Sequence, residues 1–414
     1  MMGLRSVVAA LLLACAPSIV SAQAPSAHVH GEGAHLDTDA TLKLGVDRNY
    51  RSTNDRTRFT DVYGEAEAVT KFHFRPEFFV QAKLHWERVK FATENRAFGG
   101  HGLYLEHLFA NLELDANRFV LGKFNPNFGM GWDDARLPGF YANEFAKDYQ
   151  MKEAIGAGYG RKADFGAFGE HKLDAALFFF DNTSLSRSAF NRPAYGPGQG
   201  PLSTTQRLGQ NRLVYGGPGN TASPQSVALQ YEIADPASVS GLVLAAGYRY
   251  LAAGDRQPIG GLQAGSGPVA SRASHGVVAA ARYEIGLPAG FVFTPFVEWA
   301  KFTDVFNSDP NIGVNQFKDR AYLTTAAILT WREWTLVGSR MTRTFARPDS
   351  ENVSGAFFNQ EDRQVAANIL YKVWDELTVG AGYRKTRAVP VFGNVNRQAV
   401  TNSFGVQAVY TLEF

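Results

Sequence analysis

The sequence predicts an all-β protein: a transmembrane antiparallel β-barrel of about 16 strands, with short periplasmic turns and long extracellular loops. Three observations predict this class. Segments of roughly 10 to 16 residues alternate apolar and polar side chains, which is the period of a β-strand. Short and long connections between these segments follow one another in turn. Beyond residue 22, no apolar run approaches the ~18 residues that a membrane-spanning helix needs.

The composition narrows the classes of partner. The chain has 414 residues, of which 45% are hydrophobic and 19% charged, and its net charge is +2. A nearly neutral chain gives no electrostatic support for a nucleic-acid partner. Aromatic residues make up 13% and there are 41 glycines, which suits strands with aromatic girdles and tight turns. The single cysteine, Cys15, lies in the leader, so we expect neither a disulfide nor a cysteine metal site in the mature chain.

Residues 1–22 have the pattern of a signal peptide. Arg5 provides the positive end, Val7 to Ala14 the apolar core, and Val20-Ser21-Ala22 a cleavage site of small residues. The run from Leu12 to Cys15 leaves open a lipoprotein site instead. Either way the chain is expected to be exported.

Residues 23–40 are polar and are expected to form a flexible periplasmic N-terminus. His28, His30 and His35 are weak candidates for metal ligands, because histidines at short spacing can bind zinc or copper. No second cluster completes a site in the sequence, so a solvated tail is the preferred interpretation and no metal site is predicted. Residues 41–414 are expected to form the barrel.

Sixteen segments carry the alternation or a strand-like composition. They span residues 41–50, 59–74, 77–91, 102–114, 118–125, 152–165, 172–181, 225–233, 241–251, 274–285, 291–302, 320–331, 334–345, 363–373, 377–387 and 401–414. An even number of antiparallel strands closes the sheet and removes its edges, whose backbone groups lipid cannot satisfy. No internal repeat of fixed period argues for a propeller or a solenoid.

The two faces of these segments differ in chemistry. In the last segment Phe404, Val406 and Ala408 alternate with Ser403, Gly405 and Gln407. Charged residues recur on the faces expected to point inward, and we assign four of them to a pore wall: Arg249, Arg282, Glu298 and Arg384. A packed core could not hold so many charges, but a water-filled lumen can. The segments 322–330 and 335–345 are less regular, and Arg343 falls on the face expected to point outward.

The third long connection, residues 126–151, carries the most specific signal. The strand before it ends Gly122-Lys123-Phe124, and the connection opens Asn125-Pro126-Asn127-Phe128-Gly129. Together with the signal peptide and the aromatic C-terminal Phe414, this resembles the Gram-negative outer-membrane porins with 16-stranded barrels. The resemblance implies that this loop folds into the lumen and narrows it. The acidic Pro-Glu-Phe-Gly-Gly form of the enterobacterial porins is absent, and Asn127 replaces the acid before Phe128.

The resemblance also implies a pore constriction made by charged residues of this loop. They are Asp133, Asp134, Arg136, Glu144, Lys147 and Asp148. Opposed acidic and basic groups would create a transverse field that penalises apolar solutes, while the charge balance sets ion preference.

The expected function is passive diffusion of small hydrophilic solutes and ions across the outer membrane of a Gram-negative bacterium. No motif of a hydrolase, zinc protease or phosphate-binding loop appears, so we expect neither an enzyme nor a cofactor. Expected partners are outer-membrane lipid, small polar solutes or ions, a homotrimer, and the barrel-assembly machinery through Phe414. A channel selective for phosphate or another anion, a sugar or a metal ion stays open. So do a barrel enzyme, an adhesive surface protein and a soluble periplasmic β-protein.

Overall fold

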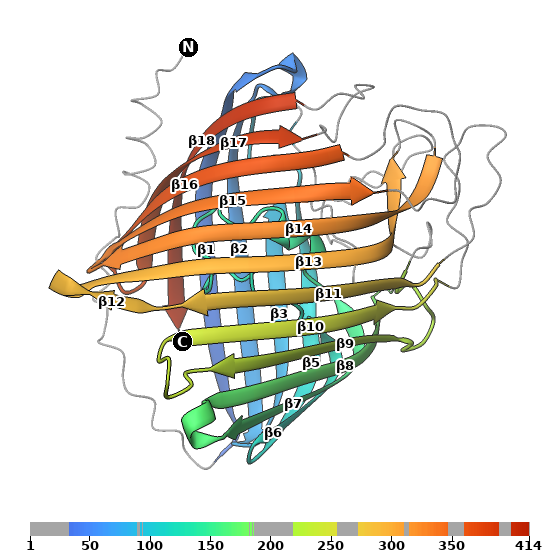
Figure 1. Ribbon diagram of the computed structural model, residues 1–414. Helices are drawn as coiled ribbons and strands as arrows, with labels where there is room; N and C mark the ends of the chain where they lie inside the picture. The colour runs from blue at the N-terminus through green and yellow to red at the C-terminus, as the bar shows by residue number, and fades with distance from the viewer. Residues whose placement is uncertain are drawn as a thin grey trace.

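A single antiparallel sheet closes on itself to form the barrel in Figure 1. The computed structural model describes residues 33–88, 92, 94–181, 183, 185, 218–254, 272–309, 314–346, 360–388 and 399–413. Apart from the short segments β4 and β12, each strand pairs with the next strand along the chain, and β18 pairs with β1 to close the sheet. The expected signal peptide, His28, His30 and Phe414 lie outside the described residues.

Eighteen strand segments build sixteen crossings of the barrel wall. The strand β12 continues β11 beside the same neighbour, β13, and β4 is a two-residue parallel bridge to β2. The predicted class and strand number are therefore confirmed. The strands are β1 His35–Ser52, β2 Thr60–Arg75, β3 Phe78–Arg88, β4 Arg96–Ala97, β5 His101–Leu114, β6 Asn117–Phe124, β7 Ala154–Asp164, β8 Glu170–Phe180, β9 Ser226–Ala234, β10 Leu242–Leu251, β11 Ser274–Tyr283, β12 Ile285–Leu287, β13 Phe291–Asp309, β14 Val314–Trp331, β15 Trp334–Ala346, β16 Gln360–Trp374, β17 Leu377–Ala388 and β18 Ala399–Glu413.

The helical segments within the described residues are short. They are the 3-10 turns η1 Asp55–Thr57, η2 Ala146–Tyr149, η3 Gly166–Phe168 and η5 Pro288–Gly290. Within the described part of the chain, no helix has the length and apolarity needed to cross a membrane.

Two expected boundaries are wrong. The first strand begins at His35, so residues 35–40 belong to the wall and are not a flexible end. They are held because their backbone groups pair with β2, and from Asp39 onward also with β18. The expected loop 303–319 is mostly strand, because β13 and β14 continue to pair beyond an irregularity between Phe302 and Val305.

The apolar side chains point outward along the strands. Leu84 is 47% exposed, Val297 42% and Phe404 46%, although all three lie within paired strands. At the end with the short turns, Phe291 stacks on Trp331 and Trp334 packs against Tyr371, as in the aromatic girdle of a membrane barrel. We call this end, where β1 begins and β18 ends, the short-turn end.

Arg343 corrects the predicted face of its strand. Val337 and Met341, on the same face of β15, are buried, and Arg343 is 5% exposed and pairs with carboxylates inside the barrel. The strand follows a regular alternation of inner and outer residues. The sequence pattern predicts the wrong face for Arg343, because the inner face of β15 mixes apolar residues with this arginine.

Candidate functional site inside the barrel

A long segment between β6 and β7 occupies part of the barrel interior. Residues 125–153, which we call the inner loop, leave the wall after Phe124 and return at Ala154. Along the way, side chains and backbone of the inner loop bond to strands distant in sequence, from β1 and β9 to β13 and β17. Only a segment inside the barrel can reach inward-facing residues of so many strands.

The start of the inner loop is anchored by Glu298 of β13. The carboxylate accepts the backbone N–H of Met130 at 2.5 Å and that of Gly131 at 3.0 Å, and it also accepts the hydroxyl of Tyr149. Gly129 has a φ of 79°, which glycine adopts without steric cost, and its N–H donates to Gln230 of β9 at 2.6 Å. The glycines of the loop entrance therefore let consecutive backbone N–H groups face the wall.

Apolar side chains of the inner loop pack against one side of the barrel. Phe128, Phe145 and Tyr149 join a cluster with Phe302 and Tyr322, and all but Phe145, which is 6% exposed, are at most 2% exposed. A second cluster unites Met130, Leu137 and Ala142 with inward residues of β10, β11, β13, β14 and β15. We call the inner faces of β10, β11, β13 and β14 the covered wall. On this side the barrel is filled by side chains.

The tip of the inner loop is tied to the opposite side. The hydroxyl of Tyr141 donates to Asp47 of β1 at 2.8 Å, and Gln364 of β16 donates to the Tyr141 carbonyl at 2.9 Å. Glu144 forms an ion pair with Arg384 of β17, whose guanidinium also lies 4.5 Å from the centre of the Tyr141 ring. The inner loop therefore spans the barrel, with its start held by β9 and β13 and its tip held by β1, β16 and β17.

The returning part of the loop is fixed by a buried arginine. Arg343 of β15 donates to Asp148 at 2.5 Å and to Asp362 of β16 at 2.6 Å. Tyr322 also donates to Asp148, at 3.2 Å. These bonds compensate the cost of desolvating one cation and two carboxylates.

A cavity of about 1340 Å³ remains between the inner loop and the uncovered strands. Its wall residues come mainly from β16 to β18 and β1 to β7, and we call these inner faces the open wall. Among the described residues of the lining, acidic residues outnumber lysines and arginines by eleven to nine. The acids are Asp47, Asp61, Glu65, Glu67, Glu87, Glu106, Asp133, Asp134, Glu144, Asp148 and Asp174, and the bases are Lys43, Lys83, Arg88, Arg96, Arg118, Lys147, Lys152, Arg343 and Arg384.

Charges of opposite sign alternate on the open wall. Lys43 lies 2.8 Å from Glu65 across the β1–β2 pair, and Arg88 and Arg96 both bond Asp61, at 3.0 and 2.6 Å. These paired charges make the surface of the open wall polar, whereas the covered wall presents mainly apolar side chains to the inner loop.

Most of the predicted constriction residues line the cavity. Asp133, Asp134, Glu144, Lys147 and Asp148 do so. Arg136 instead turns to the wall, where it pairs with Glu232 of β9 at 2.7 Å.

Of the four predicted wall residues, Arg384 alone lines this cavity. Arg249 and Glu298 are inward, but the inner loop covers them and leaves each at most 1% exposed. Arg249 lies over the Phe302 ring at 4.2 Å, and Arg282 pairs with Glu284 at 2.6 Å. The assignment of Arg249 and Glu298 to the lumen surface is wrong, because a loop that packs on the wall buries what the strand alternation turns inward. Arg282 keeps a side chain 22% exposed and is not among the residues that line this cavity.

The charged residues of the first two strands that line the open wall were not predicted from the sequence. Lys43 and Asp47 share one face of the first strand, and Glu65 and Glu67 one face of the second. Their spacing of two or four residues was the available signal.

The surroundings of Asp134 inside the barrel change the pKa of its carboxyl group. Desolvation inside the barrel opposes its ionisation, but Lys147, Lys43 and a hydrogen bond from Asn143 outweigh that effect and lower the pKa of Asp134. Lys147 lies 3.1 Å from the carboxylate, and Asn143 2.7 Å. The side chain nevertheless stays 58% exposed, so its charge is available to ions in the cavity.

Comparison with solved structures supplies the fold type. The outer-membrane channel DcaP of Acinetobacter baumannii matches 92% of this chain and 98% of its own, with a TM-score of 0.56 and 9% identity. The chain has a Gram-negative porin-type fold. OmpT of Vibrio cholerae in its trimer form matches 92% and 100% of the two chains, with a TM-score of 0.52 and 13% identity.

OmpF of Salmonella typhi, solved in complex with daunomycin, is a further structure similar to this porin-type barrel. It matches 92% and 97% of the two chains, with a TM-score of 0.53 and 12% identity. The sequence matches no protein-family model, and no curated protein is similar to it in sequence. The likeness therefore rests on the fold, which is shared with outer-membrane channels.

Proposed function

We propose that this porin-type barrel is a passive diffusion channel for small hydrophilic solutes and ions in the outer membrane. The observation that carries the proposal is the charged cavity of about 1340 Å³ beside the inner loop, enclosed by a closed barrel with apolar side chains outside. Barrels of 16 strands are wide enough to hold an aqueous channel. A fold shared with outer-membrane channels supports both the function and the location.

The charge of the lining supports a weak preference for cations. Acids outnumber lysines and arginines only slightly, and many of them are paired. Asp133 and Asp134 lie on the inner loop with side chains 35% and 58% exposed, so these carboxylates are accessible to ions in the cavity even though Arg136 and Lys147 pair with them. A field from exposed carboxylates at a narrowing raises the local concentration of cations.

The test is ion selectivity in planar bilayers. Purified protein is expected to form open channels, and the double variant Asp133→Asn/Asp134→Asn is expected to lower the cation-to-anion permeability ratio roughly twofold. Asp375→Asn is the matched control, because this carboxylate is 91% exposed in a short turn away from the cavity. Absence of any conductance would overturn the channel. Unchanged selectivity in the double variant would remove the inner loop from ion selection while leaving the channel intact.

The assembly and biogenesis that we propose follow the same comparison. A homotrimer is supported by the trimer form of the V. cholerae neighbour. We propose export by the signal peptide at residues 1–22 and recognition of the C-terminal strand, ending at Phe414, by the barrel-assembly machinery. No enzymatic activity is part of the proposal. A conductance that saturates and is blocked by one anion, sugar or metal ion would instead support a channel selective for that solute.

A further inference from the structure

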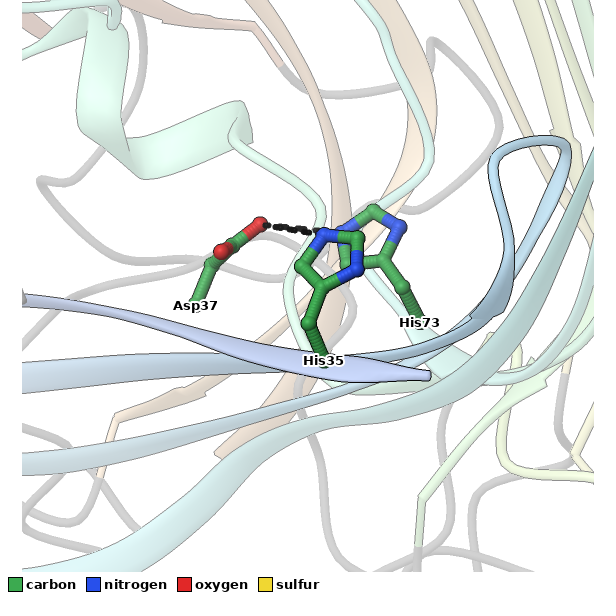
Figure 2. A group of neighbouring side chains, drawn as sticks. All are labelled: His35, Asp37 and His73. Carbon is green, nitrogen blue, oxygen red and sulfur yellow. Dashed lines mark ion pairs between the residues drawn. The ribbon is translucent and has the colours of Figure 1, made fainter. Parts of the chain in front are cut away.

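Three potential metal ligands meet at the short-turn end of the barrel. His35 and Asp37 are two residues apart on β1, so their side chains share one face. His73 of β2 is the direct cross-strand partner of His35. Figure 2 shows the three side chains pointing to the same side of the two strands, with Asp37 linked to an imidazole. The inward residues Lys43 and Glu65 have the same parity in their strands, so this face is the inner one.

The spacing of the three groups is close to a first coordination shell. Asp37 Oδ2 lies 3.2 Å from His73 Nε2 and 3.7 Å from His35 Nε2. Bonds of 2.0–2.1 Å in tetrahedral geometry place neighbouring ligand atoms of zinc about 3.3 Å apart. One ligand atom from each residue lies within 4.8 Å of the others. The two imidazoles are stacked with centroids 4.6 Å apart, so one ring must rotate to bring its nitrogen to a shared ion.

The hydrogen bond of His35 Nδ1 orients Nε2 of the same ring as the candidate metal ligand. Its Nδ1 lies 3.2 Å from the carbonyl oxygen of Gly33, which can only accept, so Nδ1 carries the proton. Nε2 then presents its lone pair on the side of Asp37. A backbone carbonyl on the second ring nitrogen is the usual support of a metal-bound histidine, because it fixes the tautomer and the ring orientation.

The surrounding charges favour a cation. Asp39, two residues after Asp37 on the same face, is the direct cross-strand partner of Glu413 of β18. Like charges at opposed positions destabilise a sheet, and a nearby cation relieves that repulsion. Lys71 is opposite Asp37 and supplies one positive charge. Phe79 packs against His73 at a centroid distance of 5.0 Å and shields one side of the ring from water.

We propose that His35, Asp37 and His73 bind a divalent transition-metal ion, which clamps the start of β1 to β2 at the short-turn end. Two imidazoles and one carboxylate suit zinc and its neighbours, whereas magnesium and calcium prefer oxygen ligands alone. The remaining coordination position is open to water. The clamp is independent of ion conduction, because the ligands lie at the mouth and outside the cavity lining.

A second cluster in the described part of the chain is a weaker candidate. Glu67, His85 and Glu106 also offer ligand atoms within 4.8 Å. Lys83 already lies 2.9 Å from Glu67 and 3.3 Å from Glu106, and its ammonium neutralises the carboxylates and repels a metal ion. Among the ion pairs of the described residues, those of the cluster at the short-turn end join Asp37 to the two imidazoles and include no lysine ammonium.

The experiment uses the mature protein in detergent, purified without a polyhistidine tag and stripped with a chelator. Zn²⁺ binding is measured by calorimetry, and thermal unfolding is measured with and without Zn²⁺. The wild type is expected to bind one equivalent of Zn²⁺ and to unfold at a higher temperature with it. His73→Ala is expected to weaken binding by at least about tenfold, and His35→Ala/His73→Ala to abolish both effects. Mg²⁺ is expected to produce neither effect.

Two further variants make the test specific. His171→Ala removes a histidine at the same end of the barrel, on β8, that contacts Tyr231 and Phe168 instead, and it should leave Zn²⁺ binding unchanged. His28→Ala/His30→Ala changes the preceding residues and should leave one equivalent bound. The proposal is overturned if the wild type binds no Zn²⁺, if His35→Ala/His73→Ala still binds it, or if only His28→Ala/His30→Ala loses it. Bilayer conductance of the same variants tests the channel separately.

Discussion

The covered wall and the open wall follow the same alternation of residues but use their inward positions differently. On the covered wall, Phe296, Ala300 and Phe302 of β13 are buried under the inner loop. On the open wall, Lys43, Glu65 and Arg88 border a cavity. The difference teaches that an inward side chain in this barrel is in water only where the inner loop leaves it uncovered.

Charged residues accordingly have two roles. Glu298 and Arg249 on the covered wall are at most 1% exposed and contact the inner loop. These two side chains position the inner loop, and they are not exposed to ions in the cavity. On the open wall, charges of opposite sign pair across strands and shape the field of the lumen. Three experiments test this comparison, in order of decreasing expected effect.

The largest effect is expected from Glu298→Ala. It leaves the N–H groups of Met130 and Gly131 and the hydroxyl of Tyr149 without their acceptor, and each buried unsatisfied donor costs about 1–3 kcal/mol. The inner loop should loosen, so single-channel conductance should rise and thermal stability should fall. Glu284→Ala, directly after β11 and with a side chain 47% exposed, is the control. Wild-type conductance and stability in Glu298→Ala would show that the loop is held by apolar packing alone.

An intermediate effect is expected on the outer face, where the two walls should not differ. Val297 of β13 and Leu84 of β3 each lie six residues into a strand that starts at the short-turn end, and both are exposed. Arginine at either position should cost about 2–4 kcal/mol, as on the lipid face of a membrane barrel near its midplane. Unfolding by denaturant in lipid vesicles measures this cost.

The control for the outer face is an inward residue of the same strand. Gln81 of β3 lines the cavity, so Gln81→Arg places its charge in water and should cost far less than Leu84→Arg. Equal costs at Gln81 and Leu84 would contradict the assignment of the outer face to lipid.

The smallest effect is expected from Asp134→Asn on the inner loop. Because the pKa of Asp134 is lowered in the folded protein, its ion pair with Lys147 stabilises the fold above the unfolded pKa of about 3.9. The stabilisation should fade as pH falls below about 4, through the lowered pKa. The pair is partly exposed, so we expect about 0–1 kcal/mol at pH 7. The difference in unfolding free energy between wild type and Asp134→Asn, measured from pH 7 to pH 2.5, checks this.

Lys147→Gln sharpens the same experiment. Without its main cationic partner, Asp134→Asn should produce a smaller and less pH-dependent difference. A pH dependence of the same size in both backgrounds would assign the effect to Lys43 or to the hydrogen bond from Asn143 instead.

The sequence predicted the strands well where one face was uniformly apolar. The alternation in residues 401–414 and 377–387 agrees with β18 and β17, because lipid outside and water inside impose opposite chemistry on the two faces. It failed at Arg343, because the inner face of β15 mixes apolar residues with this arginine, and it could not show that the inner loop covers the inward Arg249. The predicted start of the first strand, residue 41, lies after its actual start at His35, because the polar residues at its beginning resemble a solvated tail.

The sequence by itself determined the barrel, its number of strands and the charged residues carried by the loop at 126–151, because all three follow from local alternation, turn chemistry and a short motif. Tertiary structure decided which inward residues meet the cavity, since that depends on where the inner loop packs. It also decided that His35 lies beside His73, because strand register brings together residues far apart in the chain.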